Sequence, residues 1–145
     1  PNIWSIHYFK SNLQRNSNHF LNLPIPMSTS HQLGRKGEAE AAAFLTKKNY
    51  QILEKNYRYR KSEVDLIVQK NNILVAVEIK TRSTTFFGDP AFFLKTKQQH
   101  RIVEAIDYYV QQNNLDVEVR FDVISILKKN NALEIQHIEN EFYHF

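Results

Sequence analysis

The centre of the chain, residues 62–82, reads SEVDLIVQKNNILVAVEIKTR. Each half is rich in valine, isoleucine and leucine, as strands are, and the pair Asn71-Asn72 separates the halves. Asparagine tolerates the positive φ that a tight hairpin turn requires. The stretch therefore predicts two antiparallel strands, over 63–69 and 73–80, joined at the two asparagines.

Charged side chains interrupt both predicted strands. Because side chains alternate between the faces of a strand, Glu78 and Lys80 share a face with the apolar Ala76 that precedes them. Asp65 is a further charge inside the apolar run of the first strand. If the turn has two residues, residue 70 pairs with residue 73, and Asp65 then lies directly opposite Glu78.

Two opposed carboxylates suit a metal-assisted reaction. Directly opposed residues have Cβ atoms roughly 4.5–5.5 Å apart, so both carboxylates are charged only if a cation lies between them. Mg²⁺ often takes one or two carboxylates and fills its other positions with water and phosphate oxygens. Lys80 could orient or deprotonate a water. The pattern outlines a phosphodiester-hydrolysis site; the alternative is a surface ion network at a sheet edge.

The flanking sequence predicts a single α/β domain. We expect helices beginning near Ser30 and at Thr96, each with a capping box (Thr29 with Gln32, and Thr96 with Gln99), and the first should end near 47–49. Further strands are predicted over 51–58, 117–127 and 133–138. The order α-β-β-β-α-β-β indicates a mixed β-sheet flanked by helices.

Composition excludes several classes of protein. The 145 residues contain no cysteine, which rules out disulfide scaffolds, thiolate metal sites and cysteine nucleophiles. The six histidines have no zinc-motif spacing. No apolar run reaches the 18 residues typical of a membrane-spanning helix, and we expect a cytoplasmic protein. The net charge of +4 permits a polyanionic partner without establishing one.

The only methionine, Met27, divides the chain into two parts. Residues 1–26 contain no acidic group and show no sustained periodicity. We interpret 1–26 as a leader that is non-native or disordered, with Met27 as the true start and 27–145 as the domain. The alternative is a genuine N-terminal extension with little order.

Two segments, Ser62–Ile67 and Val77–Arg82, resemble the YraN-like family of the PD-(D/E)XK (restriction-endonuclease-like) nuclease superfamily. The resemblance runs from about Ser30 to Phe142, and its further matches are Gly34, Gly37, Glu38, Ala41, Asn49, Tyr50, Asn56, Tyr57, Arg58, Phe87, Gly88, Pro90, Lys97, Arg120, Phe121, Asp122, Val123, His137 and Ile138. Ser62 departs from the family by standing where glycine is usual, and Phe92-Phe93 replace smaller or polar residues.

The resemblance implies a restriction-endonuclease-like core and a set of site residues. Asp65 and Glu78 would be the ligands of Mg²⁺ or Mn²⁺, Lys80 the catalytic lysine, and Glu38 an accessory acid in the first helix. Glu38 also has another interpretation, as a first-turn acid that the helix dipole stabilises. Asp122 is predicted to pair with Arg120 or a neighbouring strand for structural reasons.

Basic and polar residues around these positions are candidates for binding nucleic acid. The candidates are Arg58, Arg60, Lys61, Arg82, Lys97, Gln98 and Arg101. Tyr57 and Tyr59 stand among the basic residues and could stack on bases, although a solvated, charge-protected edge strand explains the same pattern. We therefore expect a metal-dependent nuclease acting on DNA, including branched or structured DNA, with RNA as a second possible partner. The alternative is a non-catalytic domain of the same fold that binds nucleic acid or protein.

Overall fold

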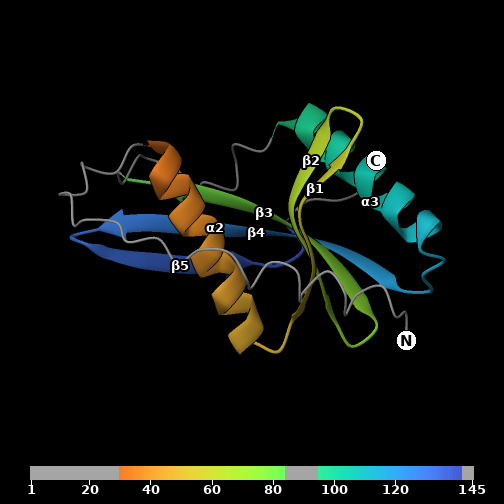
Figure 1. The fold of residues 1–145 in the computed structure, drawn as a ribbon, viewed down its shortest axis with the longest axis horizontal. Helices are drawn as coiled ribbons and strands as arrows, with labels where there is room; N and C mark the ends of the chain where they lie inside the picture. Colours follow the sequence, from red (N-terminus) through yellow and green to blue (C-terminus); the bar gives the residue numbers. More distant parts are fainter. Residues whose placement is uncertain (1–29, 84–94, 142–145) are drawn as a thin grey trace, which may run out of the picture.

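A computed structural model of the chain describes residues 30–83 and 95–141 (Figure 1). The leader 1–26, Thr29 of the first capping box, and Phe92-Phe93 lie outside these ranges. Within them the elements are α2 (Ser30–Lys47), β1 (Gln51–Tyr59), β2 (Ser62–Lys70), β3 (Ile73–Arg82), α3 (Thr96–Gln112), β4 (Glu118–Lys129) and β5 (Ala132–Ile138). The predicted order of elements is confirmed.

The five strands form one mixed sheet in the order β1-β2-β3-β4-β5. Strands β3 and β4 pair in parallel, with α3 in the connection between them, and the other neighbours are antiparallel. The predicted turn is confirmed as well, because Lys70 pairs with Ile73 and Asn71 has a φ of 54°. This two-residue turn sets the register of β2 against β3.

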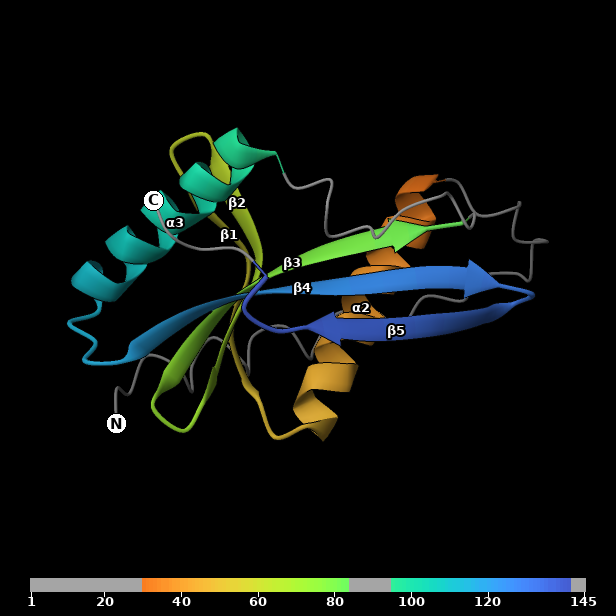
Figure 2. The same ribbon diagram turned by 180° about the vertical axis from the view of Figure 1, so that it is seen from behind.

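The two helices cover different parts of the sheet (Figure 1). Helix α2 packs chiefly on β3, and α3 packs on β2 and β1. Seen from behind, α2 lies on the far side of β3, β4 and β5 (Figure 2). Neighbouring residues of β3 therefore serve two cores, with Val75 in the cluster that includes Leu45 of α2 and Ala76 in the cluster that includes Ile106 of α3. Neither helix is long and apolar enough to cross a membrane, as far as residues 30–83 and 95–141 show.

The predicted end of α2 agrees with the structure, whereas the predicted cap at the start of α3 does not. Asn49, just after α2, has a φ of 66°, the left-handed conformation expected beyond a helix C-terminus. The capping box predicted at Thr96 is wrong. Lys95 is the extended residue that precedes α3, it makes no side-chain capping hydrogen bond, and Thr96 is already helical. A capping residue needs a non-helical backbone, which Thr96 lacks.

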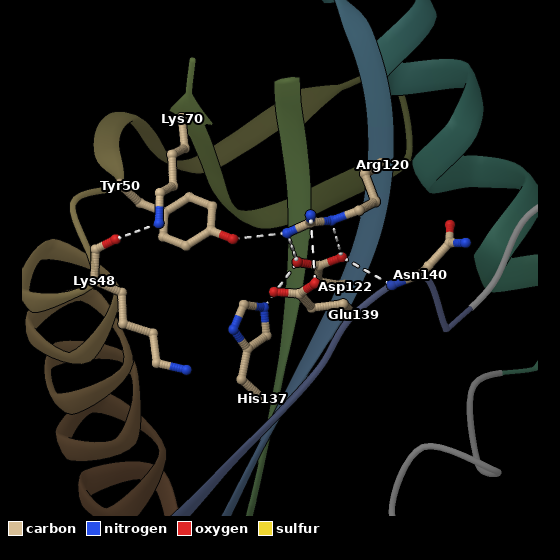
Figure 3. Close-up of polar contacts among 8 residues, drawn as sticks. All are labelled: Lys48, Tyr50, Lys70, Arg120, Asp122, His137, Glu139 and Asn140. Atoms are coloured by element: carbon tan, nitrogen blue, oxygen red, sulfur yellow. Dashed lines mark hydrogen bonds and ion pairs between the residues drawn. The ribbon is translucent and has the colours of Figure 1, made fainter. Parts of the chain in front are cut away.

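A buried ion network joins β4 to β5 and to Tyr50, the residue before β1 (Figure 3). The Asp122 side chain is fully buried and accepts four hydrogen bonds, from Arg120 Nε and Nη2, His137 Nε2 and the Asn140 amide, at 2.7–3.0 Å. Arg120 Nη2 also donates to the Tyr50 hydroxyl at 2.8 Å. The predicted structural pairing of Asp122 with Arg120 is confirmed, and the buried carboxylate on β4 has four hydrogen bonds.

The hydrogen bonds decide the charge of Asp122. Burial by itself raises the pKa of this carboxyl, but the bonds from His137, Arg120 and the Asn140 amide outweigh burial and leave the pKa below its usual value. The pKa of Arg120 is raised, first by its hydrogen bond with Asp122. Both groups are therefore ionised at neutral pH. Each buried charge then has an opposite charge beside it, which offsets the cost of burial.

Candidate functional site

The candidate site lies where β2 and β3 separate. The last pair of their ladder at this end is Leu66 with Val77, and β2 then curves away from β3 (Figure 1). Asp65, the next residue of β2, accepts a hydrogen bond from the Ile79 amide at 2.7 Å through Oδ2. The register predicted from the turn is therefore confirmed as far as Leu66. The predicted pairing of Asp65 with Glu78 is not part of the ladder, because the strands separate there and the Asp65 carboxylate accepts the hydrogen bond of the Ile79 amide.

Irregularities in β1 accompany this separation. The register of β1 against β2 shifts between Ile52 and Glu54, as at a β-bulge. Asn56 has a φ of 51°, which is uncommon inside a strand, and stands across from the Asp65 region. Bulges bend a strand and increase its twist, so they help to turn the β1–β2 hairpin away from β3.

Glu78 is the buried acid of the site. Its side chain is 7% exposed, and its Oε1 accepts hydrogen bonds from Lys80 Nζ at 2.8 Å and from Gln98 Nε2 at 2.7 Å. Lys80 stands two residues further along the same face of β3, as the alternation predicted. Gln98 comes from the first turn of α3, and its side chain contacts Glu78, while its role in binding nucleic acid stays a prediction.

Asp65 is electrostatically coupled to the other charged residues of the site. Burial, followed by the charge of Glu78, raises the pKa of Asp65 to about 7, against the opposing effects of the Ile79 amide and of Lys80. The charge of Glu38 also raises this pKa. The other three residues predicted as catalytic therefore all affect the charge of Asp65, although they come from α2 and β3.

A close contact between α2 and β3 brings Glu38 to this site. Gly37 is buried, and a Cβ there would overlap the Thr81 side chain, so only glycine allows the helix to approach the strand this closely. Thr81 follows Lys80, and Glu38 follows Gly37. The alternative interpretation of Glu38 as a first-turn acid is wrong, because the first turn of α2 contains no acidic residue.

The predicted nucleic-acid-binding residues lie in several environments. Arg58 pairs with Glu63 at 2.9 Å, and Arg60 pairs with Glu104 of α3 at 2.7 Å, both at the surface. Lys61, Lys97 and Arg101 are exposed, whereas Arg82 is half-buried at the end of β3. Tyr57 packs edge-on against Tyr109, so it belongs to the α3 interface.

The donor set of the site fits a hard divalent cation that keeps several water ligands. In the parts of the chain that the structure describes, no group of three histidine, aspartate or glutamate side chains is arranged to hold a metal ion. Asp65 and Glu78 provide two carboxylates, which is the number Mg²⁺ often takes from a protein when phosphate and water complete its shell. Asp65 and Glu78 are therefore the residues of this site that could hold Mg²⁺ or Mn²⁺.

The coupling of Asp65 predicts that removing its charge stabilises the metal-free protein. Because the folded pKa is raised, the folded state holds a proton that the unfolded state releases, so stability falls as pH rises from about 4 to about 7. Asp65→Asn keeps an acceptor for the Ile79 amide, but it cannot ionise, so its stability should not fall between about pH 4 and about pH 7. We expect its free energy of unfolding at pH 8 to exceed that of the wild type by about 1–2 kcal/mol.

Urea unfolding at pH 5 and pH 8 measures this effect. Asp107→Asn is the matched control, since Asp107 is an exposed carboxylate on α3, and it should change stability little at either pH. An Asp65→Asn protein that is less stable than the wild type at pH 8 would show that the charge of Asp65 does not destabilise the folded protein.

Comparison with known proteins identifies relatives of the chain. The model of the "Uncharacterised protein family UPF0102" matches residues 37–126, a span that contains the four predicted catalytic residues. A UPF0102 protein of Christiangramia forsetii is 49% identical over 119 residues, covering 82% of this chain and all of the relative. A UPF0102 protein of Flavobacterium psychrophilum is 46% identical with the same coverage, and one of Chloroherpeton thalassium is 39% identical over 80% of this chain and 97% of the relative. The chain belongs to the UPF0102 family.

Proposed function

We propose that the protein is a metal-dependent nuclease of the PD-(D/E)XK superfamily that hydrolyses phosphodiester bonds of DNA. The observation that carries the proposal is the placement of two carboxylates, Asp65 and Glu78, where β2 leaves β3, with the ammonium of Lys80 2.8 Å from Glu78. A mixed sheet with a helix on each side agrees with the restriction-endonuclease-like core that the resemblance implies.

Each residue has a distinct role in this proposal. Asp65 and Glu78 would hold the divalent cation, which supplies positive charge at the phosphate and lowers the pKa of a bound water. Lys80 orients the attacking water and stabilises the negative charge that develops on the phosphate. Gln98 keeps Glu78 in place through its hydrogen bond to Oε1, and Glu38 adds negative charge beside Asp65.

Charge also favours an enzyme over a domain that only binds nucleic acid. DNA phosphates are repelled by carboxylates, so a binding surface gains nothing from a buried acid next to a second acid whose pKa is raised to about 7. A cation held between these acids removes the repulsion and attracts the phosphate. The same arrangement that opposes simple binding thus serves metal-assisted hydrolysis.

Cleavage of a panel of DNA substrates tests the proposal. Single-stranded, duplex, flapped and four-way-junction DNA are incubated with Mg²⁺, Mn²⁺ or EDTA and either the wild type or Glu78→Gln. We expect metal-dependent cleavage of at least one substrate, and a rate at least ~100-fold lower for Glu78→Gln, because the lost charge weakens the metal site.

The matched control for Glu78→Gln is Glu134→Gln. Glu134 also accepts from a lysine at 2.8 Å, Lys129, but both side chains are exposed on the β4–β5 hairpin. The Glu134→Gln rate should equal that of the wild type. If the wild type cuts none of the substrates with either metal, or if Glu78→Gln cuts as fast as the wild type, the nuclease proposal is wrong.

A further inference from the structure

Two stacked tyrosines form an aromatic surface beside the β1–β2 turn. Tyr59, the last residue of β1, stacks on Tyr108 of α3 with ring centroids 4.1 Å apart and planes inclined by 21°. Tyr108 is 37% exposed. Among residues 30–83 and 95–141 it is the one large hydrophobic residue that is exposed. The guanidinium of Arg60 lies 5.1 Å from the Tyr59 ring centroid. The surface therefore combines an exposed aromatic ring with a neighbouring cation.

A line of exposed residues connects this surface with the candidate site. Lys97, Arg101, Glu104 and Tyr108 are spaced by four, three and four residues, so they follow one flank of α3. The line begins next to Gln98, whose side chain contacts Glu78. From residue 98 to residue 108 the helix rises about 15 Å, which matches roughly four nucleotides of a stacked strand at 3.4 Å each.

The charge of this line favours a polyanion. Its one acid, Glu104, pairs with Arg60 at 2.7 Å, and both side chains are about half exposed or more. Such surface pairs contribute little stability, so Arg60 can exchange Glu104 for a phosphate at small cost. Lys97, Arg101 and Arg60 together exceed Glu104 by two positive charges.

From this arrangement we infer that the Tyr59–Tyr108 surface binds single-stranded DNA by stacking an unpaired base on Tyr108. Lys97 and Arg101 would contact the phosphates between that base and the carboxylates. Bases inside a duplex already stack on one another, so only an unpaired segment can use the tyrosine. That the DNA strand runs from Tyr108 toward Asp65 and Glu78 rests on the proposed function. The stacking of a base on Tyr108 does not depend on it.

An abasic ligand separates stacking from phosphate contacts. Fluorescence anisotropy in EDTA, where no cleavage takes place, compares octathymidylate with an abasic octamer of the same backbone charge. The wild type should bind octathymidylate about tenfold or more tightly than the abasic octamer. Tyr108→Ala should lose this preference and bind both about equally, and Tyr108→Phe should retain it because its ring still stacks.

A charge variant tests the phosphate contacts in the same assay. Arg101→Ala should weaken both ligands by the same factor and reduce the slope of log affinity against log salt by about 0.7. Lys47→Ala, at the exposed end of α2, should change neither. Thermal melting checks that each variant is folded.

The outcomes distinguish this inference from the proposed function. Failure of the wild type to bind octathymidylate, or a Tyr108→Ala protein that keeps the base preference, overturns the inference. The expected binding pattern in a protein that cuts no DNA supports the inference and contradicts the nuclease proposal.

Discussion

Replacing Lys80 by methionine should lower the rate of metal-dependent DNA cleavage at least ~100-fold, the contribution expected of a positioned acid–base or charge-stabilising group. Methionine keeps much of the length of lysine but has no ammonium group. Of the two hydrogen bonds to Glu78 Oε1, the one from Lys80 is lost and the one from Gln98 stays. The attacking water would lose its partner on β3, and the developing charge on the phosphate would lose its counter-ion.

The pH dependence adds a readout that a loss of folding would not reproduce. Burial and Glu78 raise the pKa of Asp65 to about 7, and Lys80 opposes that rise. Asp65 must release its proton to bind a cation, so at sub-saturating Mg²⁺, where metal and proton compete for Asp65, cleavage by the wild type should increase with pH through about 7. Without Lys80 the pKa of Asp65 rises further, and the residual cleavage of Lys80→Met should require a higher pH.

Lys129→Met is the matched control for Lys80→Met. Lys129 pairs with Glu134 at the same 2.8 Å distance as Lys80 with Glu78, but half of its side chain is exposed. Initial rates from pH 6 to pH 9 in Mg²⁺ and in Mn²⁺ should match the wild type for this control. A Lys80→Met protein with wild-type rates across that range would exclude Lys80 from the reaction.

Asp122→Asn should reduce the free energy of unfolding by about 3–5 kcal/mol, the usual cost of removing one partner of a buried ion pair. The change removes the nearer counter-ion of the Arg120 guanidinium, which is 19% exposed, and leaves it with the Glu139 carboxylate at 3.5 Å. It also places an amide NH₂ where Asp122 now accepts hydrogen bonds from Arg120, His137 and the Asn140 amide. At least one of these donors is then left facing another donor.

Urea unfolding at pH 7 measures the loss, and Glu63→Gln provides the control. Glu63 pairs with Arg58 at the surface, so its replacement should cost less than about 1 kcal/mol. Because the folded pKa of Asp122 is lowered, its contribution is present above pH ~4 and disappears as pH falls through the folded pKa. An Asp122→Asn protein within 1 kcal/mol of the wild type at pH 7 would mean that the network adds no net stability.

Local features of the sequence predict most of the secondary structure correctly. The paired asparagines at 71–72 occupy a two-residue turn, and those at 130–131 occupy another, with φ values of 44° and 66°. Strand ends were predicted to within about two residues. The capping box at Thr96 failed because the spacing of two side chains does not report which residue has the non-helical backbone.

The sequence by itself determined the β2–β3 hairpin, its register between the turn and Leu66, and the common face of Glu78 and Lys80, because a turn of two residues and the alternation of side chains are local properties of the chain. Only the tertiary structure decided which distant groups meet at that face. Gln98 contacts Glu78 through the packing of α3, and Glu38 comes near enough to raise the pKa of Asp65 because Gly37 lets α2 approach Thr81. Likewise, His137 and Asp122 meet because β5 pairs with β4. Such contacts depend on how helices and strands far apart in the chain pack together, and no local pattern encodes that packing.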